Sequence, residues 1–88
     1  MTVTRRASAG TLESSDVFVT LEPAEGLTID IDSVVKEQFG DAIRAACEDV
    51  LREMDVTDAR VSIVDRGALD CVIRARVETA VLRGRGDE

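Results

Sequence analysis

The sequence predicts a small α+β fold, in which an antiparallel-type sheet with an N-terminal hairpin packs against one long helix and a second, C-terminal helix. Alternation of apolar and polar side chains between residues 17 and 32 is typical of strands. The run that follows repeats apolar side chains at three- and four-residue steps, which is typical of a helix lying on a sheet. The 88 residues are expected to form one domain, with residues 1–8 and 84–88 as frayed ends.

The N-terminal hairpin is predicted from two extended segments joined by a polar turn. Residues 17–22 alternate, apart from Phe18, and Pro23 closes that strand. An extended piece at 7–12 is expected to pair with it. Residues 13–16 (Glu-Ser-Ser-Asp) then form the hairpin tip, since these residue types favour turns.

A third strand and the long helix follow in order. Residues 27–32 alternate most regularly, and the helical stripe begins near Val35, with Asp32 or Ser33 expected to cap it. Gly40 lies inside the helix, where it costs about 1 kcal/mol relative to alanine, and a packing reason is expected for it. The stripe consists of Val35, Phe39, Ala42, Ile43, Ala46, Val50, Leu51 and Met54.

Residues 59–65 predict a further strand, whereas residues 69–83 fit either a helix or a strand. As a helix, this last segment gives one apolar stripe and aligns Asp70, Arg74 and Glu78 at i,i+4 spacing. As a strand, its apolar side chains alternate with Arg74 and other residues. The alanines and the aligned charges favour the helix.

Composition excludes several functional classes. Eighteen acidic against eleven basic residues give a net charge of −7, which opposes binding to nucleic acid. The chain has no histidine, so Ser-His-Asp and Cys-His catalysis are excluded and no metal site is expected. Cys47 and Cys71 are expected to be buried, reduced thiols. No apolar run is long enough for a bilayer and no signal peptide is recognisable, so no membrane association and a cytoplasmic location are expected.

Ser14 is the candidate functional residue, because it offers one nucleophile that another protein could reach. Its side chain is small, and it lies in the predicted turn, with Glu13 before it and Ser15 and Asp16 after it. The flexible Gly10 precedes this turn. The structural alternative is that the hydroxyls of Ser14 and Ser15 hydrogen-bond the turn backbone.

Three segments, in this order and over a matching length, resemble the acyl carrier (gamma) subunit of citrate lyase. They are Ala9-Gly10-Thr11-Leu12-Glu13-Ser14-Ser15-Asp16, Lys36-Glu37-Gln38-Phe39-Gly40-Asp41-Ala42-Ile43-Arg44, and Asp65-Arg66-Gly67-Ala68-Leu69-Asp70-Cys71-Val72-Ile73-Arg74-Ala75-Arg76. The resemblance implies that Ser14 bears covalently bound 2'-(5''-phosphoribosyl)-3'-dephospho-CoA through a phosphodiester. Arg66 stands where the family often has lysine, which keeps the positive charge.

The resemblance also implies partners and a non-catalytic role. An attaching transferase loads the prosthetic arm, whose thiol holds an acetyl thioester. The citrate lyase alpha (transferase) subunit exchanges acetyl for citrate, and the beta (lyase) subunit releases oxaloacetate and regenerates the acetyl form. Two alternatives are the related carrier of malonate decarboxylase and a non-covalent scaffolding or regulatory module.

The segment that begins at Asp65 has two interpretations. In the first, Arg74 and Arg76 form a docking patch for partners or for the phosphates of the arm. In the second, which we favour, Gly67 is a turn residue, Asp70 caps a helix and the two arginines are a solvated face.

Overall fold

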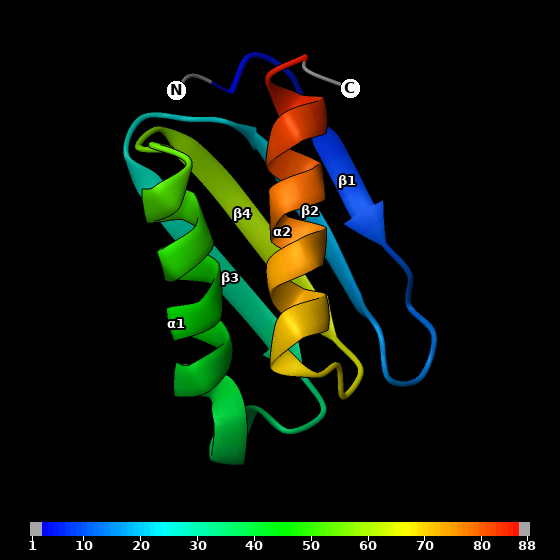
Figure 1. The fold of residues 1–88 in the computed structure, drawn as a ribbon. Helices are drawn as coiled ribbons and strands as arrows, with labels where there is room; N and C mark the ends of the chain where they lie inside the picture. The colour runs from blue at the N-terminus through cyan, green and yellow to red at the C-terminus, as the bar shows by residue number, and fades with distance from the viewer. Residues whose placement is uncertain (1–2, 87–88) are drawn as a thin grey trace.

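The computed structural model describes residues 3–86, which form a four-stranded sheet with two helices packed on one face (Figure 1). This confirms the predicted α+β class. The elements are β1 (Ala7–Gly10), β2 (Val17–Pro23), β3 (Leu27–Ser33), α1 (Lys36–Glu53), β4 (Ala59–Asp65) and α2 (Asp70–Gly84).

The strand order is β1-β2-β4-β3, and the sheet is mixed. The predicted hairpin is confirmed: β1 and β2 are antiparallel, with Ala9 opposite Val19. β2 also pairs antiparallel with β4, whereas β3 runs parallel to β4, with Ile31 opposite Ile63. This last pair differs from the antiparallel type expected, because α1 returns the chain across the helical face to start β4 at the same end as β3.

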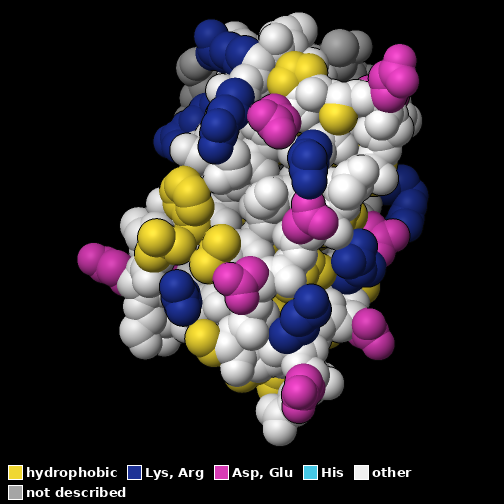
Figure 2. Space-filling view, turned by 180° about the vertical axis from the view of Figure 1, so that it is seen from behind, with side chains coloured by type: hydrophobic (Ala, Val, Ile, Leu, Met, Phe, Trp, Pro, Cys, Tyr) yellow, Lys and Arg dark blue, Asp and Glu magenta, His cyan; other side chains and the backbone are white. Residues whose placement is uncertain are grey.

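The core lies between the sheet and the helices and is wholly aliphatic apart from Cys47. Inward side chains of β2 and β4, such as Leu21 and Ile63, meet Leu51 of α1 and Val77 of α2, and all four are essentially inaccessible to solvent. The opposite face of the sheet is not covered by any described element. Figure 2 shows that face, with charges of both signs scattered over it and hydrophobic side chains gathered toward one side.

Residues 70–84 form a helix, so the favoured of the two interpretations is confirmed. Its buried side chains, Ile73, Val77, Ala80 and Val81, fall on one stripe. Asp70 is not the cap that was predicted, because Leu69 occupies that position and no side chain caps the helix. Asp70 is instead the first helical residue and accepts a hydrogen bond from Arg74 Nε at 2.6 Å.

The start of α1 differs from the sequence prediction in three ways. Val35 precedes the helix and no side chain caps it; the Ser33 hydroxyl accepts the Val35 amide instead. Phe39, assigned to the buried stripe, is 54% exposed. A Cβ at Gly40 would meet only Lys36 Cγ, at 3.2 Å, so tight packing does not explain this glycine.

The N-terminal segment is ordered against α2 rather than frayed. Val3 is buried, and the amides of Thr4 and Arg5 donate to the Gly84 carbonyl at 3.0 and 3.1 Å. Gly84, also predicted to lie in a frayed end, is itself buried. These backbone bonds join the two ends of the chain; residues 1–2 and 87–88 lie outside the described range.

Candidate functional site

Ser14 lies in the loop 11–16 that joins β1 to β2, at one end of the molecule. The same end carries the carboxyl ends of β3 and β4 and the amino ends of both helices (Figure 1). Ser14 and Ser15 are exposed, and neither hydroxyl makes a hydrogen bond to any residue in the range 3–86. The alternative, that these hydroxyls hydrogen-bond the turn backbone, is therefore wrong.

The loop 11–16 closes on itself through its backbone. The Thr11 amide donates to the Val17 carbonyl at 3.2 Å, and the Asp16 amide donates to the Glu13 carbonyl at 3.1 Å. Gly10 adopts a φ of 94°, and a Cβ there would lie 1.8 Å from the Val17 carbonyl oxygen. Only glycine fits this close approach, which explains why the loop needs Gly10.

Two further backbone bonds fix the loop to the β4–α2 turn. The Ser15 amide donates to the Arg66 carbonyl at 2.8 Å, and the Arg66 amide donates to the Asp16 carbonyl at 2.9 Å. Ser15 takes a left-handed φ of 65°, which a non-glycine residue adopts rarely. The first and third sequence segments of the resemblance are thus in direct contact, although about fifty residues separate them.

Asp16 connects the loop to α2. Its carboxylate accepts Thr11 Oγ1 at 2.6 Å and the Val17 amide at 2.8 Å. Arg76 of α2 completes the set with a two-point contact, Nε to Oδ1 at 3.2 Å and Nη2 to Oδ2 at 3.1 Å. The hydrogen bonds from Thr11 and Val17, and then the pairing with Arg76, lower the pKa of Asp16 to about 2 from an ordinary 3.8. Asp16 is therefore a fixed anion in the frame of the loop and a poor general base.

Both interpretations of Arg74 and Arg76 need correction, since each arginine is bound within the domain. Arg76 holds Asp16, and Arg74 bridges Asp70 and Asp49, with Nη2 at 3.1 Å from Asp49 Oδ2. Neither is therefore a free docking patch or a merely solvated charge. Gly67 is in a turn with a φ of 89°, as predicted.

Asp65 is a structural residue that sequence reasoning missed. It is 1% exposed, accepts the Ser33 hydroxyl at 2.8 Å on Oδ2, and accepts the Ala68 amide at 2.9 Å on Oδ1. It therefore joins the β3–α1 connection to the β4–α2 turn. A signal was present, because Val61, Ile63 and Asp65 share the inward face of a period-two strand.

The remaining chemistry-bearing groups do not gather near Ser14. Burial raises the pKa of the Cys47 thiol to about 12, whereas Cys71, expected to be buried, is exposed on the first turn of α2. Within residues 3–86, no group of carboxylates and thiols is arranged to bind a metal ion. Over the same range, no helix has the length and apolar character needed to cross a bilayer.

Comparison with known proteins decides the family. Residues 4–84 match the family described as Malonate decarboxylase delta subunit (MdcD). The citrate lyase acyl carrier protein of Haemophilus influenzae (strain PittEE) is 51% identical over 83 residues, covering 94% of this chain and 87% of the relative. The chain belongs to this acyl carrier family. A second member, from Vibrio cholerae serotype O1 (strain M66-2), is 53% identical over 85 residues, covering 94% and 87% of the two chains.

A solved structure supports the same family at the level of the fold. A chain in the crystal structure of a Pseudomonas malonate decarboxylase hetero-tetramer in complex with malonate superposes with a TM-score of 0.77. The identity is 26%, and the match covers 94% of this chain and 87% of that chain. This chain therefore shares its fold with one chain of that hetero-tetramer.

Proposed function

We propose that Ser14 carries 2'-(5''-phosphoribosyl)-3'-dephospho-CoA through a phosphodiester, and that the arm serves a citrate lyase complex. When bound, this group supplies a thiol that holds acetyl and citryl thioesters. The observation that carries the proposal is the hydroxyl of Ser14, which is exposed, makes no hydrogen bond within residues 3–86, and sits on a loop fixed by backbone bonds.

The surroundings of Ser14 suit a negatively charged phosphodiester. The Arg66 side chain is exposed and makes no hydrogen bond or ion pair within the described residues. Its backbone is bonded to Ser15 and Asp16, so its guanidinium starts next to the attachment point and can hold a phosphate oxygen. The amino ends of α1 and α2, which carry partial positive charge, lie at the same end of the molecule.

The domain itself supplies attachment and orientation rather than catalysis. The chain has no histidine. The carboxylate of Asp16, which is fixed in the Ser14 loop, is already paired with Arg76. The proposed partners, the alpha transferase and beta lyase subunits, would act on the thioester. A tethered acyl group reaches both at a high effective concentration. The two unpaired cysteines support a reducing, cytoplasmic setting.

The carrier of a malonate decarboxylase is the second candidate, favoured by the family description and by the structural match. Citrate lyase is preferred, because several relatives with that name are about half identical to this chain, against 26% for the decarboxylase chain. The third candidate function is that of a non-covalent scaffolding module.

The deciding experiment is the intact mass of the protein purified from its native complex, followed by peptide mapping. We expect one added mass equal to the phosphoribosyl-dephospho-CoA group, with or without acetyl, on the peptide that contains Ser14. Ser14→Ala should abolish the addition and the citrate cleavage of the assembled complex, whereas its neighbour variant Ser15→Ala should keep both. An addition on another residue would refute Ser14 as the site. A chain that stays unmodified after treatment with the attaching enzyme would leave only the scaffold.

A further inference from the structure

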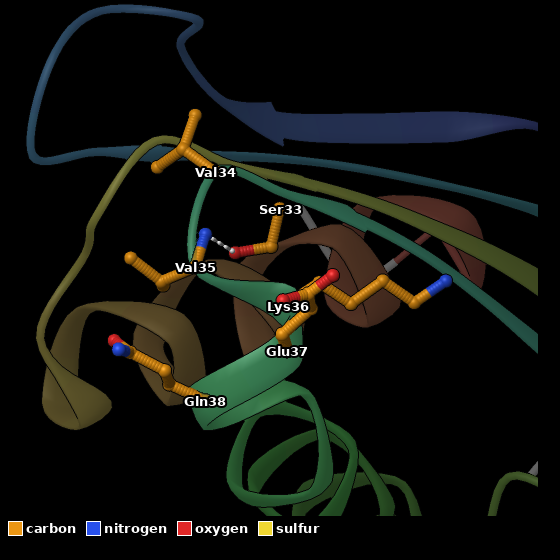
Figure 3. A pocket seen from close by; sticks show the side chains of 6 residues that line it. All are labelled: Ser33, Val34, Val35, Lys36, Glu37 and Gln38. Carbon is orange, nitrogen blue, oxygen red and sulfur yellow. Dashed lines mark hydrogen bonds between the residues drawn. The ribbon is translucent and has the colours of Figure 1, made fainter.

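The position of Ser14 is set by its neighbours in the chain. Neither its amide nor its hydroxyl makes a hydrogen bond within residues 3–86. Residues 33–38 form an open hollow of about 510 Å³ at the start of α1, and none of them belongs to the loop 11–16 (Figure 3). That hollow does not orient Ser14. The direction of its hydroxyl therefore depends on how the rest of the loop is held.

Ser15 and Asp16 together face one residue, Arg66, and so form a β-bulge at the base of the loop. The Ser15 amide donates to the Arg66 carbonyl, and the Arg66 amide donates to the Asp16 carbonyl. The left-handed first residue of such a bulge is typically glycine, but here it is Ser15, with a φ of 65°. A serine keeps this conformation only when its surroundings impose it. The direction of Ser14 thus depends on an anchor that stops Ser15 from relaxing.

Arg76 supplies an anchor from outside the hairpin. Its Nε and Nη2 donate to the two carboxylate oxygens of Asp16, at 3.2 and 3.1 Å. Its Cδ lies 3.4 Å from the position that a Cβ on Gly10 would take, so its aliphatic stem lies against the other end of the loop. The Asp16 side chain is only 16% exposed, so water competes little for this pair. One arginine of α2 therefore holds the loop at both of its ends.

We propose that Arg76 is a positioning residue for the loading of the arm onto Ser14, an inference that rests on the proposed function. In this step the Ser14 oxygen attacks the phosphorus of an arm donor that carries a phosphoanhydride. The new P–O bond to Ser14 forms while the anhydride P–O bond breaks and releases phosphate or pyrophosphate. The hydroxyl proton passes to a base of the attaching enzyme or to water.

The rate of such an attack depends on where the oxygen lies, because a misplacement of about 1 Å can cost roughly 100-fold. Arg76 does not touch the reacting atoms. It acts on Ser14 through Asp16 and the strained Ser15. Its loss should therefore slow the reaction of the bound carrier more than it weakens binding to the attaching enzyme.

The test is the steady-state loading of apo-carriers by the purified attaching enzyme, with the arm donor in excess and intact mass as the readout. Arg76→Gln should lower kcat by about 10- to 100-fold and change KM by less than about twofold. Arg76→Lys keeps the charge but loses the two-point geometry, so its kcat should lie in between. Arg74→Gln is the matched control and should load like the wild type. Arg74 is also on α2, is similarly exposed and also binds carboxylates, but those of Asp70 and Asp49.

Hydrogen exchange of the apo-carriers gives a readout that does not involve the arm. The Ser15 amide should exchange about tenfold faster in Arg76→Gln and at the wild-type rate in Arg74→Gln, because only the first change loosens the bulge. Asp16→Asn should reproduce the loss of kcat. The double variant Asp16→Asn/Arg76→Gln should load no more slowly than Arg76→Gln, as expected for two groups that act as one unit. Thermal melting identifies the variants that are folded at the assay temperature, and Arg76→Lys and Asp16→Asn carry the test if Arg76→Gln is not.

The outcomes separate this inference from the proposed function. If the wild type is loaded on Ser14 and the Arg76 variants keep its kcat, the inference is wrong and the carrier role stands. A raised KM with unchanged kcat would make Arg76 a contact for the attaching enzyme and would also overturn it. So would an equal loss of kcat in Arg74→Gln, since that loss would reflect stability alone. If the wild type takes up no arm at all, the proposed function fails, and the inference with it.

Discussion

The two ends of this domain are closed by different kinds of interaction. At the end opposite Ser14, α2 packs closely on β2 and on the N-terminal segment, so that a Cβ at Gly84 would come within 2.7 Å of Leu21 Cδ1 and 3.2 Å of Val3 Cγ1. Val3 is buried there as well. At the Ser14 end, backbone bonds and the Asp16–Arg76 pair fix the loop, while large apolar side chains stay exposed.

The difference teaches how a loop can be rigid and still leave a hydroxyl free. Packing fixes a segment by covering its side chains, which would bury Ser14. Hydrogen bonds fix the backbone through main-chain groups and the Asp16 carboxylate, so they leave the Ser14 side chain uncovered. The Ser14 end is therefore expected to depend on polar and conformational restraints more than on buried area.

The strongest way to break the Ser14 end is Gly10→Ala. The new methyl would meet the Val17 carbonyl at 1.8 Å, and the φ of 94° is strained for alanine. We expect a loss of about 3–5 kcal/mol in the free energy of unfolding. Urea denaturation followed by circular dichroism measures it.

Gly67→Ala is the matched control, because Gly67 also has a positive φ, of 89°, but open space around it. It should lose only about 1 kcal/mol, the conformational part of the effect. Equal losses in the two variants would show that the contact with Val17 is unimportant.

Asp65→Ala tests the polar joint between the two connections at this end. The substitution removes the buried acceptor of the Ser33 hydroxyl and of the Ala68 amide. We therefore expect a loss of about 2–3 kcal/mol in the free energy of unfolding. Ser33→Ala keeps the bond from the Ala68 amide but removes the bond to Asp65 and the bond from the part-buried Val35 amide, so it should lose about 1–2 kcal/mol. The same denaturation experiment measures both, and a smaller loss for Asp65→Ala than for Ser33→Ala would contradict the assignment.

Asp16 makes the Ser14 loop sensitive to acid. Its pKa in the folded protein is about 2, against an ordinary 3.8, so its contribution is fully present above pH 3.8 and is lost as the pH falls through 2. We expect the melting temperature of the wild type to fall across this range more steeply than that of Asp16→Asn. Asp58→Asn provides the control, because that carboxylate accepts a backbone amide, from Gly26, outside the Ser14 end. Parallel pH profiles for the wild type and Asp16→Asn would refute this role.

Gly40→Ala should have the smallest effect and the opposite sign. The added methyl meets only the flexible Lys36 side chain, at 3.2 Å, so the gain in helix propensity should raise stability by about 0.5–1 kcal/mol. The loading of Ser14 should not change. Denaturation and intact mass measure the two quantities, and a loss of stability would show that Lys36 cannot move aside.

The sequence predicted most elements because their side-chain periods are local. The strand at 59–65 and the long helix are confirmed almost to the residue, and only the extent of the first strand, predicted at 7–12 and found at Ala7–Gly10, was overestimated. Properties that depend on distant partners were missed. The predicted stripe is buried at Ile43, Ala46, Val50 and Leu51, but its members nearer the start of α1, Phe39 and Ala42, are exposed.

The candidate site was predicted only in part, for the same reason. The turn at Ser14 follows from local residue types, but Arg76 reaches Asp16 across sixty positions and no local pattern contains that pairing. The parallel β3–β4 register likewise depends on the path of the helix between the strands. Whether Ser14 bears the arm is not tested by the fold, so that part remains a prediction.

The fixed loop also sets the geometry of any assembly that uses it. Because Ser15 and Asp16 are bonded to the β4–α2 turn, the base of an arm on Ser14 would be a stationary pivot and the loop would add nothing to its reach. The thiol could then explore only a volume whose radius is one arm length. Every active site that the arm serves must open within that radius of a single oxygen atom, which limits how far apart the catalytic subunits of the complex can be placed.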